Sequence, residues 1–128
     1  MFYLAFENSF CEDYITGKLF RVLEVDVLPI VRGGADYKSA VPPKSIINVQ
    51  DYESSAYLAN YLKYLQRNQT AYDKYFEWKR KYTALPAWGV PWVGCRDCAA
   101  IRYYLLQNKS EIVNLEEFYD MKQCRNEL

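Results

Sequence analysis

The first twenty residues constrain the fold of this chain more than any other stretch. A hydrophobic run, Phe2–Phe6, is followed by a polar turn at residues 7–9. After Asp13, apolar residues recur at helical spacing, at Ile15, Leu19 and Val22. We therefore predict a strand, a polar loop and a helix, in that order. In a parallel α/β sheet, this junction lies at the carboxyl end of the strand, where the N-terminus of a helix favours a phosphate group.

The next segments continue an open α/β pattern. A β-branched run, Val27–Val31, predicts a buried strand, and Pro29 within it indicates a sheet edge or the start of a strand. Residues 35–44 contain two adjacent prolines and read as a loop, and Ser45–Val49 predicts another strand. The order strand, helix, strand, loop, strand predicts an α/β, Rossmann-like open parallel sheet with flanking helices.

Two further helices are predicted before the chain becomes irregular. Ser54 or Ser55 can cap a helix with apolar residues at helical spacing, and a second helix is expected to start near Thr70 and Asp73. Pro86, Gly89, Pro91 and Gly94 then break the pattern, and two short helices are predicted over 98–106 and 114–119. We expect one domain over 1–128, with 83–128 as an irregular loop plus a C-terminal helical extension.

Composition excludes several classes of function. The chain has 16 basic and 16 acidic residues among 128, so it has no broad positive surface for nucleic acid. Its apolar runs are too short to span a bilayer, and no signal sequence is visible at the N-terminus. A phosphate site in this chain is therefore expected to depend on local charge, and Lys18 in the first turn of the predicted helix can supply it.

The four cysteines allow more than one interpretation. Cys95 and Cys98 form a Cys-x-x-Cys motif, which occurs in disulfides, in redox pairs and in halves of zinc sites. The chain has no histidine, which excludes a Cys/His zinc site, and a four-cysteine site requires Cys11 and Cys124 to converge on the pair. The acidic pair in residues 24–26 lies between a helix and a strand, which is typical of a solvated turn. We predict no structural metal.

Four residues near the first loop are candidates for binding a ligand, although each also has an ordinary structural role. Asn8 can donate its amide to a phosphate oxygen or satisfy a turn, and Lys18 can neutralise a phosphate or stand in solvent. Tyr14 can cover a nucleotide or belong to an amphipathic helix. Thr16 can contact a ligand or serve as the N-cap of the helix.

Several motifs in the same order resemble one known family. FYLAFENS, DYITGKLF, VLPIVRGGADY and PPKSIINVQDY are similar to the nucleotide-sugar-binding half of the α-1,3-fucosyltransferases, and the resemblance covers nearly the whole chain. The resemblance implies the C-terminal domain of a GT-B glycosyltransferase. It also implies inverting transfer of L-fucose from GDP-fucose to N-acetylglucosamine of glycans, in the Golgi lumen, with the donor GDP-fucose and no cofactor.

The resemblance assigns roles to the candidate residues. It implies that Asn8 contacts the diphosphate of the donor and that Lys18 neutralises charge on the departing GDP. Tyr14 and Thr16 are assigned to the same substrate-binding site. The family forms disulfides at its C-terminal Cys-x-x-Cys, so we expect a disulfide at Cys95 and Cys98.

Two departures from the family pattern bear on activity. Gly17 stands where the family has a glutamate that binds the donor through its ribose hydroxyls, and losing such a charge-assisted hydrogen bond costs about 1.5 to 3 kcal/mol. Arg21 stands where the family has Asn or a small residue. The catalytic carboxylate and the glycan-binding surface belong to the family's N-terminal half, so no catalytic residue is assigned and the chain alone is expected to be inactive.

Two alternatives to a donor-binding half remain open. The chain can be a degenerate, non-catalytic GDP-sugar-binding or interaction module, which Gly17 favours. It can also be unable to fold stably alone, if a face that the other half normally covers is exposed.

Overall fold

The computed structural model describes residues 2–85, 98, 101–103, 105–106 and 124–125. The chain divides into two compact units, one formed by Met1–Ala84 with Lys122–Leu128 and the other by Leu85–Met121. In the second unit, the described residues of the predicted 98–106 helix are helical. The predicted helix over 114–119 and the proline- and glycine-rich loop from residue 86 lie outside the described residues.

A parallel three-stranded sheet forms the centre of the first unit. Strand β3 (Leu28–Arg32) lies between β1 (Phe2–Phe6) and β4 (Ile47–Asn48), and both pairings are parallel. In register, Leu4 faces Ile30 and Ile30 faces Ile47. The predicted α/β, Rossmann-like open parallel sheet is therefore confirmed.

Pro29 occupies the central strand, yet it causes no conflict there. It pairs with Tyr3 of β1, whereas the two residues of β4 pair only with Ile30 and Val31. Because a proline cannot donate a ladder hydrogen bond, it is tolerated where the strand has a neighbour on one side only. Pro29 thus lies at the start of β3, one of the two positions that the sequence indicated.

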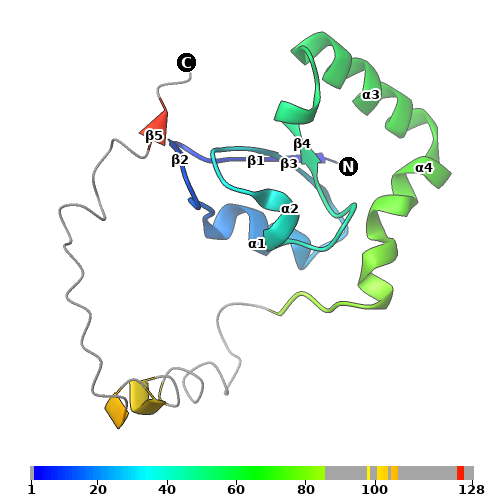
Figure 1. The fold of residues 1–128 in the computed structure, drawn as a ribbon. Helices are drawn as coiled ribbons and strands as arrows, with labels where there is room; N and C mark the ends of the chain where they lie inside the picture. The colour runs from blue at the N-terminus through cyan, green and yellow to red at the C-terminus, as the bar shows by residue number, and fades with distance from the viewer. Residues whose placement is uncertain (1, 86–97, 99–100, 104, 107–123, 126–128) are drawn as a thin grey trace. The chain divides into compact units, whose positions relative to one another are not determined.

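The first two helices lie on one face of the sheet in Figure 1. Helix α1 (Gly17–Leu23) starts at Thr16, whose side chain accepts a hydrogen bond from the Lys18 backbone N–H. Helix α2 (Tyr37–Ala40) was not predicted, because the adjacent prolines in residues 35–44 favoured a loop. Asp36 caps this short helix by accepting from the Lys38 backbone N–H, and its last turn ends before the prolines.

The predicted strand over Ser45–Val49 is shorter in the structure. The hydroxyl of Ser45 donates to the Pro42 carbonyl at 2.6 Å, which holds Ser45 in a turn ahead of β4. Asn48 caps the 3₁₀ helix η1 (Val49–Asp51) through the Gln50 backbone N–H. Side chains that bind the local backbone therefore end the strand on both sides.

Leu65 of the next helix packs with Leu28, Ile30 and Ile47, on the face of the sheet opposite α1. Helix α3 (Ser55–Arg67) starts at Ser54, one of the two predicted caps. The second predicted helix consists of two elements, α4 (Gln69–Asp73), which Asn68 caps, and the 3₁₀ helix η2 (Lys74–Arg80). The prediction of one continuous helix was therefore wrong in this region.

Two hydrophobic clusters correspond to the two faces of the sheet. The cluster on the α1 face includes Ala5, Leu19, Val31, Tyr37 and Trp78. The cluster on the α3 face has a different set of buried residues, Leu28, Ile30, Ile47 and Leu65. Alternate residues of β3 thus face opposite clusters, which is the pattern of a strand covered on both faces.

The first unit also contains a second, two-stranded sheet. Strand β2 (Phe10–Cys11) pairs antiparallel with β5 (Cys124–Arg125), and a disulfide joins Cys11 to Cys124. The sequence did not predict this disulfide. Cys98 is exposed and free, so the structure does not contain the disulfide expected at Cys95 and Cys98, and Cys95 lies outside the described residues. Strand pairing places Cys11 opposite Cys124, which explains the observed partner.

We predict that this disulfide contributes substantially to stability. Crosslinking residues that are 113 positions apart restricts the unfolded chain strongly, and a native disulfide typically contributes about 2 to 4 kcal/mol. The double variant Cys11→Ser and Cys124→Ser should lower the free energy of unfolding, measured by urea denaturation, by about that amount. The matched control, Cys98→Ser, should leave it unchanged. Equal stability of the double variant and the wild type would contradict the prediction.

A group of tyrosines lies between α3 and η2. The hydroxyls of Tyr61 and Tyr75 are hydrogen-bonded at 2.8 Å, and the rings of Tyr52 and Tyr61 lie 5.6 Å apart. Burial, and then the neighbouring Tyr61 and Asp51, raise the pKa of Tyr52 to about 12. Burial and the hydrogen bond to Tyr61 raise the pKa of Tyr75 well above its ordinary value.

These pKa shifts predict a loss of stability at alkaline pH. Tyrosine in the unfolded chain ionises near pH 10. The folded protein keeps Tyr52 and Tyr75 protonated there, so the unfolded state gains more from ionisation. The contribution of these two tyrosines to the free energy of unfolding should be constant below pH 10 and should fall from pH 10 toward 12. Urea denaturation at pH 8, 10 and 11 measures the slope, and Tyr75→Phe should make it shallower. An unchanged slope in Tyr75→Phe would count against this explanation.

Candidate functional site

The candidate site is built on the carboxyl end of β1. The Glu7 backbone N–H donates to the Arg32 carbonyl at 2.9 Å, which continues the pairing with β3 one residue past the strand. The Glu7 side chain is buried, and its carboxylate accepts from both the backbone N–H and the hydroxyl of Thr16, each at 2.8 Å. The start of α1 is therefore attached directly to the end of β1.

Lys18 and Asn8 meet at the same place. The Lys18 ammonium donates to the Asn8 Oδ1 at 3.0 Å and to the Phe6 carbonyl at 2.9 Å. An ammonium has three N–H donors, so one remains for a ligand. Asn8 faces Lys18 with its oxygen, and its amide N–H donors have no partner among the described residues. Both side chains are exposed, so this arrangement can present a positive charge and amide donors to an anion.

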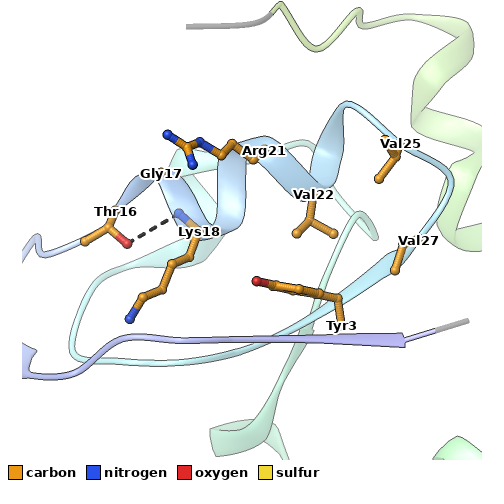
Figure 2. Close-up of a pocket in the computed structure, with 8 residues that line it drawn as sticks. All are labelled: Tyr3, Thr16, Gly17, Lys18, Arg21, Val22, Val25 and Val27. Carbon is orange, nitrogen blue, oxygen red and sulfur yellow. Dashed lines mark hydrogen bonds between the residues drawn. The ribbon is translucent and has the colours of Figure 1, made fainter.

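A pocket of about 480 Å³ adjoins this pair, between β1 and α1 (Figure 2). In Figure 2, the Tyr3 ring lies between β1 and Val22 of α1, and Lys18 extends from the helix toward the strand. The lining contains two basic side chains and no carboxylate. Its residues are Tyr3, Thr16, Gly17, Lys18, Arg21, Val22, Val25 and Val27.

The four predicted binding residues occupy different places. Thr16 and Lys18 line the pocket, and Asn8 is joined to it through Lys18. Tyr14 is half-buried ahead of α1 and does not line the pocket. The structure thus brings three of the four residues together and leaves Tyr14 outside the group.

Gly17 leaves open space in the pocket. A Cβ atom at this position would lie 3.8 Å from the Arg21 Nε, which is an ordinary van der Waals distance. Gly17 is the first residue of α1 and is exposed. A larger side chain can therefore be accommodated at residue 17 without displacing the backbone.

The two glycines that follow β3, unlike Gly17, leave no room for a side chain. A Cβ at Gly33 would collide with the Tyr37 hydroxyl and would lie 3.3 Å from the Glu7 Cγ, and a Cβ at Gly34 would lie 2.6 Å from the Cys11 carbonyl oxygen. The Tyr37 hydroxyl is buried without a hydrogen-bond partner in the described part of the chain. Burial and the nearby Glu7 raise the pKa of Tyr37. Close packing at this strand end thus encloses the Glu7 side chain.

The described residues contain no candidate metal centre. No group of three or more His, Cys, Asp or Glu side chains is close enough to hold a metal ion among the residues that the structure describes. Residues 24–26 form the expected turn, in which Asp26 is 87% exposed and pairs with Lys79 at 2.7 Å. Within the described ranges, no helix has the length and apolar character needed to cross a membrane.

The fold and the site together define a class of protein. A parallel α/β sheet with a basic residue and amide donors at the carboxyl end of its first strand is typical of nucleotide-binding domains. Comparison with known families identifies which one: the chain belongs to glycosyltransferase family 10 (fucosyltransferase), whose C-terminal profile matches residues 1–118. The resemblance that the motifs carried is therefore confirmed.

Individual relatives support the same family. The chain is 47% identical over 81 residues to alpha-(1,3)-fucosyltransferase C of Drosophila melanogaster, which covers 63% of this chain. It is 44% identical over 106 residues, 79% of the chain, to alpha-(1,3)-fucosyltransferase 4 of Homo sapiens. It is 36% identical over 123 residues, 92% of the chain, to the 4-galactosyl-N-acetylglucosaminide 3-alpha-L-fucosyltransferase 9 of Pan troglodytes.

The chain matches only part of each relative. The matched region spans 19% of the Drosophila protein, 20% of the human protein and 33% of the chimpanzee protein. The chain therefore covers no more than about a third of the length of each of these relatives.

Sequence reasoning assigned Glu7 no functional role. Its position directly after the predicted strand, nine residues before a threonine that can cap the next helix, was the available signal. That pattern alone does not reveal that the two side chains meet.

Proposed function

We propose that this chain is the donor-binding part of an α-1,3-fucosyltransferase-like protein, which transfers L-fucose from GDP-fucose to N-acetylglucosamine in glycans with inversion, in the Golgi lumen. Membership of the fucosyltransferase family and the names of the relatives support this proposal. The observation that carries it is the contact between Lys18 and Asn8 at the carboxyl end of β1.

The chemistry of this pair suits a diphosphate. Transfer of the sugar leaves negative charge on the departing GDP, and a fixed positive group beside it stabilises that charge. Lys18 is held by two hydrogen bonds before any ligand arrives, so little reorganisation is needed. Asn8 supplies neutral donors next to it. The donor in this proposal needs no metal, because Lys18 supplies the positive charge.

The acceptor side of the reaction requires groups beyond this region. Inverting transfer needs a general base to remove the proton of the acceptor hydroxyl. We assign that base, and glycan recognition, to the part of the relatives that this chain does not span. The 128 residues alone are expected to bind the donor without transferring fucose.

A second candidate is a non-catalytic module that keeps the fold and has lost the donor. Gly17 favours it, because the pocket lining contains no carboxylate that can bind ribose hydroxyls. Calorimetry with GDP separates the two candidates, because a module that has lost the donor should show no heat of binding even at millimolar GDP.

We predict that Lys18→Ala weakens GDP binding. Loss of a charge-assisted contact costs about 1.5 to 3 kcal/mol, so the dissociation constant measured by isothermal titration calorimetry should rise about tenfold or more. The matched control is Lys63→Ala, which removes an exposed lysine of α3 away from the pocket. Equal losses in the two variants would show that GDP responds only to overall charge.

We also predict that Gly17→Glu strengthens GDP binding. The space beside Arg21 admits the side chain, and its carboxylate can accept from the ribose hydroxyls, which should raise the affinity about tenfold. Gly17→Gln, of equal length and without charge, should give a smaller gain. The gain should be absent with 2′,3′-dideoxy-GDP, which lacks both hydroxyls.

The same titrations can also show the opposite result, which is weaker GDP binding by Gly17→Glu. A carboxylate near Lys18 repels a diphosphate if the ribose lies elsewhere. Weaker binding of both GDP and dideoxy-GDP by Gly17→Glu would therefore place the ribose outside this pocket.

A further inference from the structure

Glu7 connects three elements of the first unit through its backbone and its side chain. Its residue extends β1, its backbone N–H binds Arg32 at the end of β3, and its side chain binds Thr16 at the start of α1. The Thr16 hydroxyl lies 2.8 Å from one carboxylate oxygen and 3.1 Å from the other. Glu7 is only 6% exposed, so these hydrogen bonds are little weakened by water.

A second link joins the same two segments from Lys18. Its ammonium binds the Phe6 carbonyl and the Asn8 side chain, which belong to the residues immediately before and after Glu7. The Lys18 backbone N–H also donates to the Thr16 hydroxyl at 3.4 Å, so Thr16 lies between the two links. The position of the Lys18 ammonium thus depends on where Thr16 is held.

We propose that Glu7 is a positioning residue for Lys18: its carboxylate fixes Thr16, and through it the first turn of α1, so that the ammonium stays beside Asn8. The proposal rests on the proposed function, in which that ammonium binds the diphosphate of the donor. Glu7 itself is enclosed by Gly33 and Tyr37 and does not line the pocket, so it acts through Lys18 and not on the ligand.

The charge and the length of Glu7 both matter for this role. A carboxylate accepts at both oxygens, whereas a glutamine amide accepts at one and must turn donors toward Thr16. Hydrogen bonds to an ionised acceptor are about twice as strong as neutral ones. Glu7→Gln therefore loosens the start of α1 while it keeps the volume of the side chain.

The test is a double-mutant cycle on GDP affinity in the full chain. Glu7→Gln should weaken GDP binding about tenfold, and Lys18→Ala should then cost no more than about twofold further in that background. Thr16→Val, which keeps the backbone N–H and loses the hydroxyl, should weaken binding in the same direction by less. Fully additive losses from Glu7→Gln and Lys18→Ala would overturn the proposal.

Two controls separate positioning from general stability. Tyr37→Phe removes a buried hydroxyl near Glu7 that has no partner in the described residues, and it should leave GDP affinity unchanged. Melting temperatures measured for all variants should not rank in the order of their GDP affinities. If affinity instead follows melting temperature across the set, Glu7 has only a structural role and the proposal fails.

A readout without ligand distinguishes this proposal from the proposed function. A hydrogen-bonded ammonium exchanges slowly with water, so the Lys18 side chain should give a protected ¹⁵N signal in the wild type that Glu7→Gln abolishes and Tyr37→Phe retains. Persistence of the signal in Glu7→Gln overturns the positioning role. If the signal depends on Glu7 but the wild type does not bind GDP, the donor function fails while the link between Glu7 and Lys18 stands.

Discussion

The hydrogen bonds between Glu7 and Thr16 are the constraint on which the arrangement of the site depends. A parallel sheet brings the end of β1 and the start of α1 to the same edge, but it does not fix their separation. A buried carboxylate that accepts from both the backbone and the hydroxyl of Thr16 sets that separation at hydrogen-bond distance. The Lys18 ammonium, two residues further on, consequently reaches the carbonyl of Phe6 and the side chain of Asn8.

This arrangement explains how a chain without net charge can offer an anion site. The 16 basic and 16 acidic residues cancel over the molecule, so long-range attraction contributes little. Binding must then come from a few groups placed before the ligand arrives. Lys18 and Asn8 meet this requirement. Tyr3 and Val22 line the pocket, and they give a planar ring of a ligand an apolar surface to contact.

The sequence predicted the features that depend on local patterns. The run Phe2–Phe6, the helical spacing after Asp13 and the cap at Ser54 each act over a few residues, and all three appear in the structure. The meeting of Asn8 with Lys18 also followed, because sheet topology brings a strand end and the next helix together. The pairing of Cys11 with Cys124 was beyond such reasoning, since 113 residues separate the two. Helix α2 was missed because the prolines after it outweighed the cap at Asp36.

The fold at the start of α1 does not depend on a side chain at residue 17. The helix start is held by Thr16 through Glu7, and residue 17 contributes no side chain to either link. A change from glutamate to glycine at this position can therefore remove a ligand contact while β1, α1 and the Lys18 ammonium keep their places. Arg21 is exposed and lies one turn further along α1. With Lys18 it gives the pocket lining two basic groups, and the lining contains no acidic group. Under the proposed function, a site altered in this way keeps the Lys18 and Asn8 contacts for a phosphate and lacks a carboxylate for a ribose, so we expect its specificity to change before its fold does.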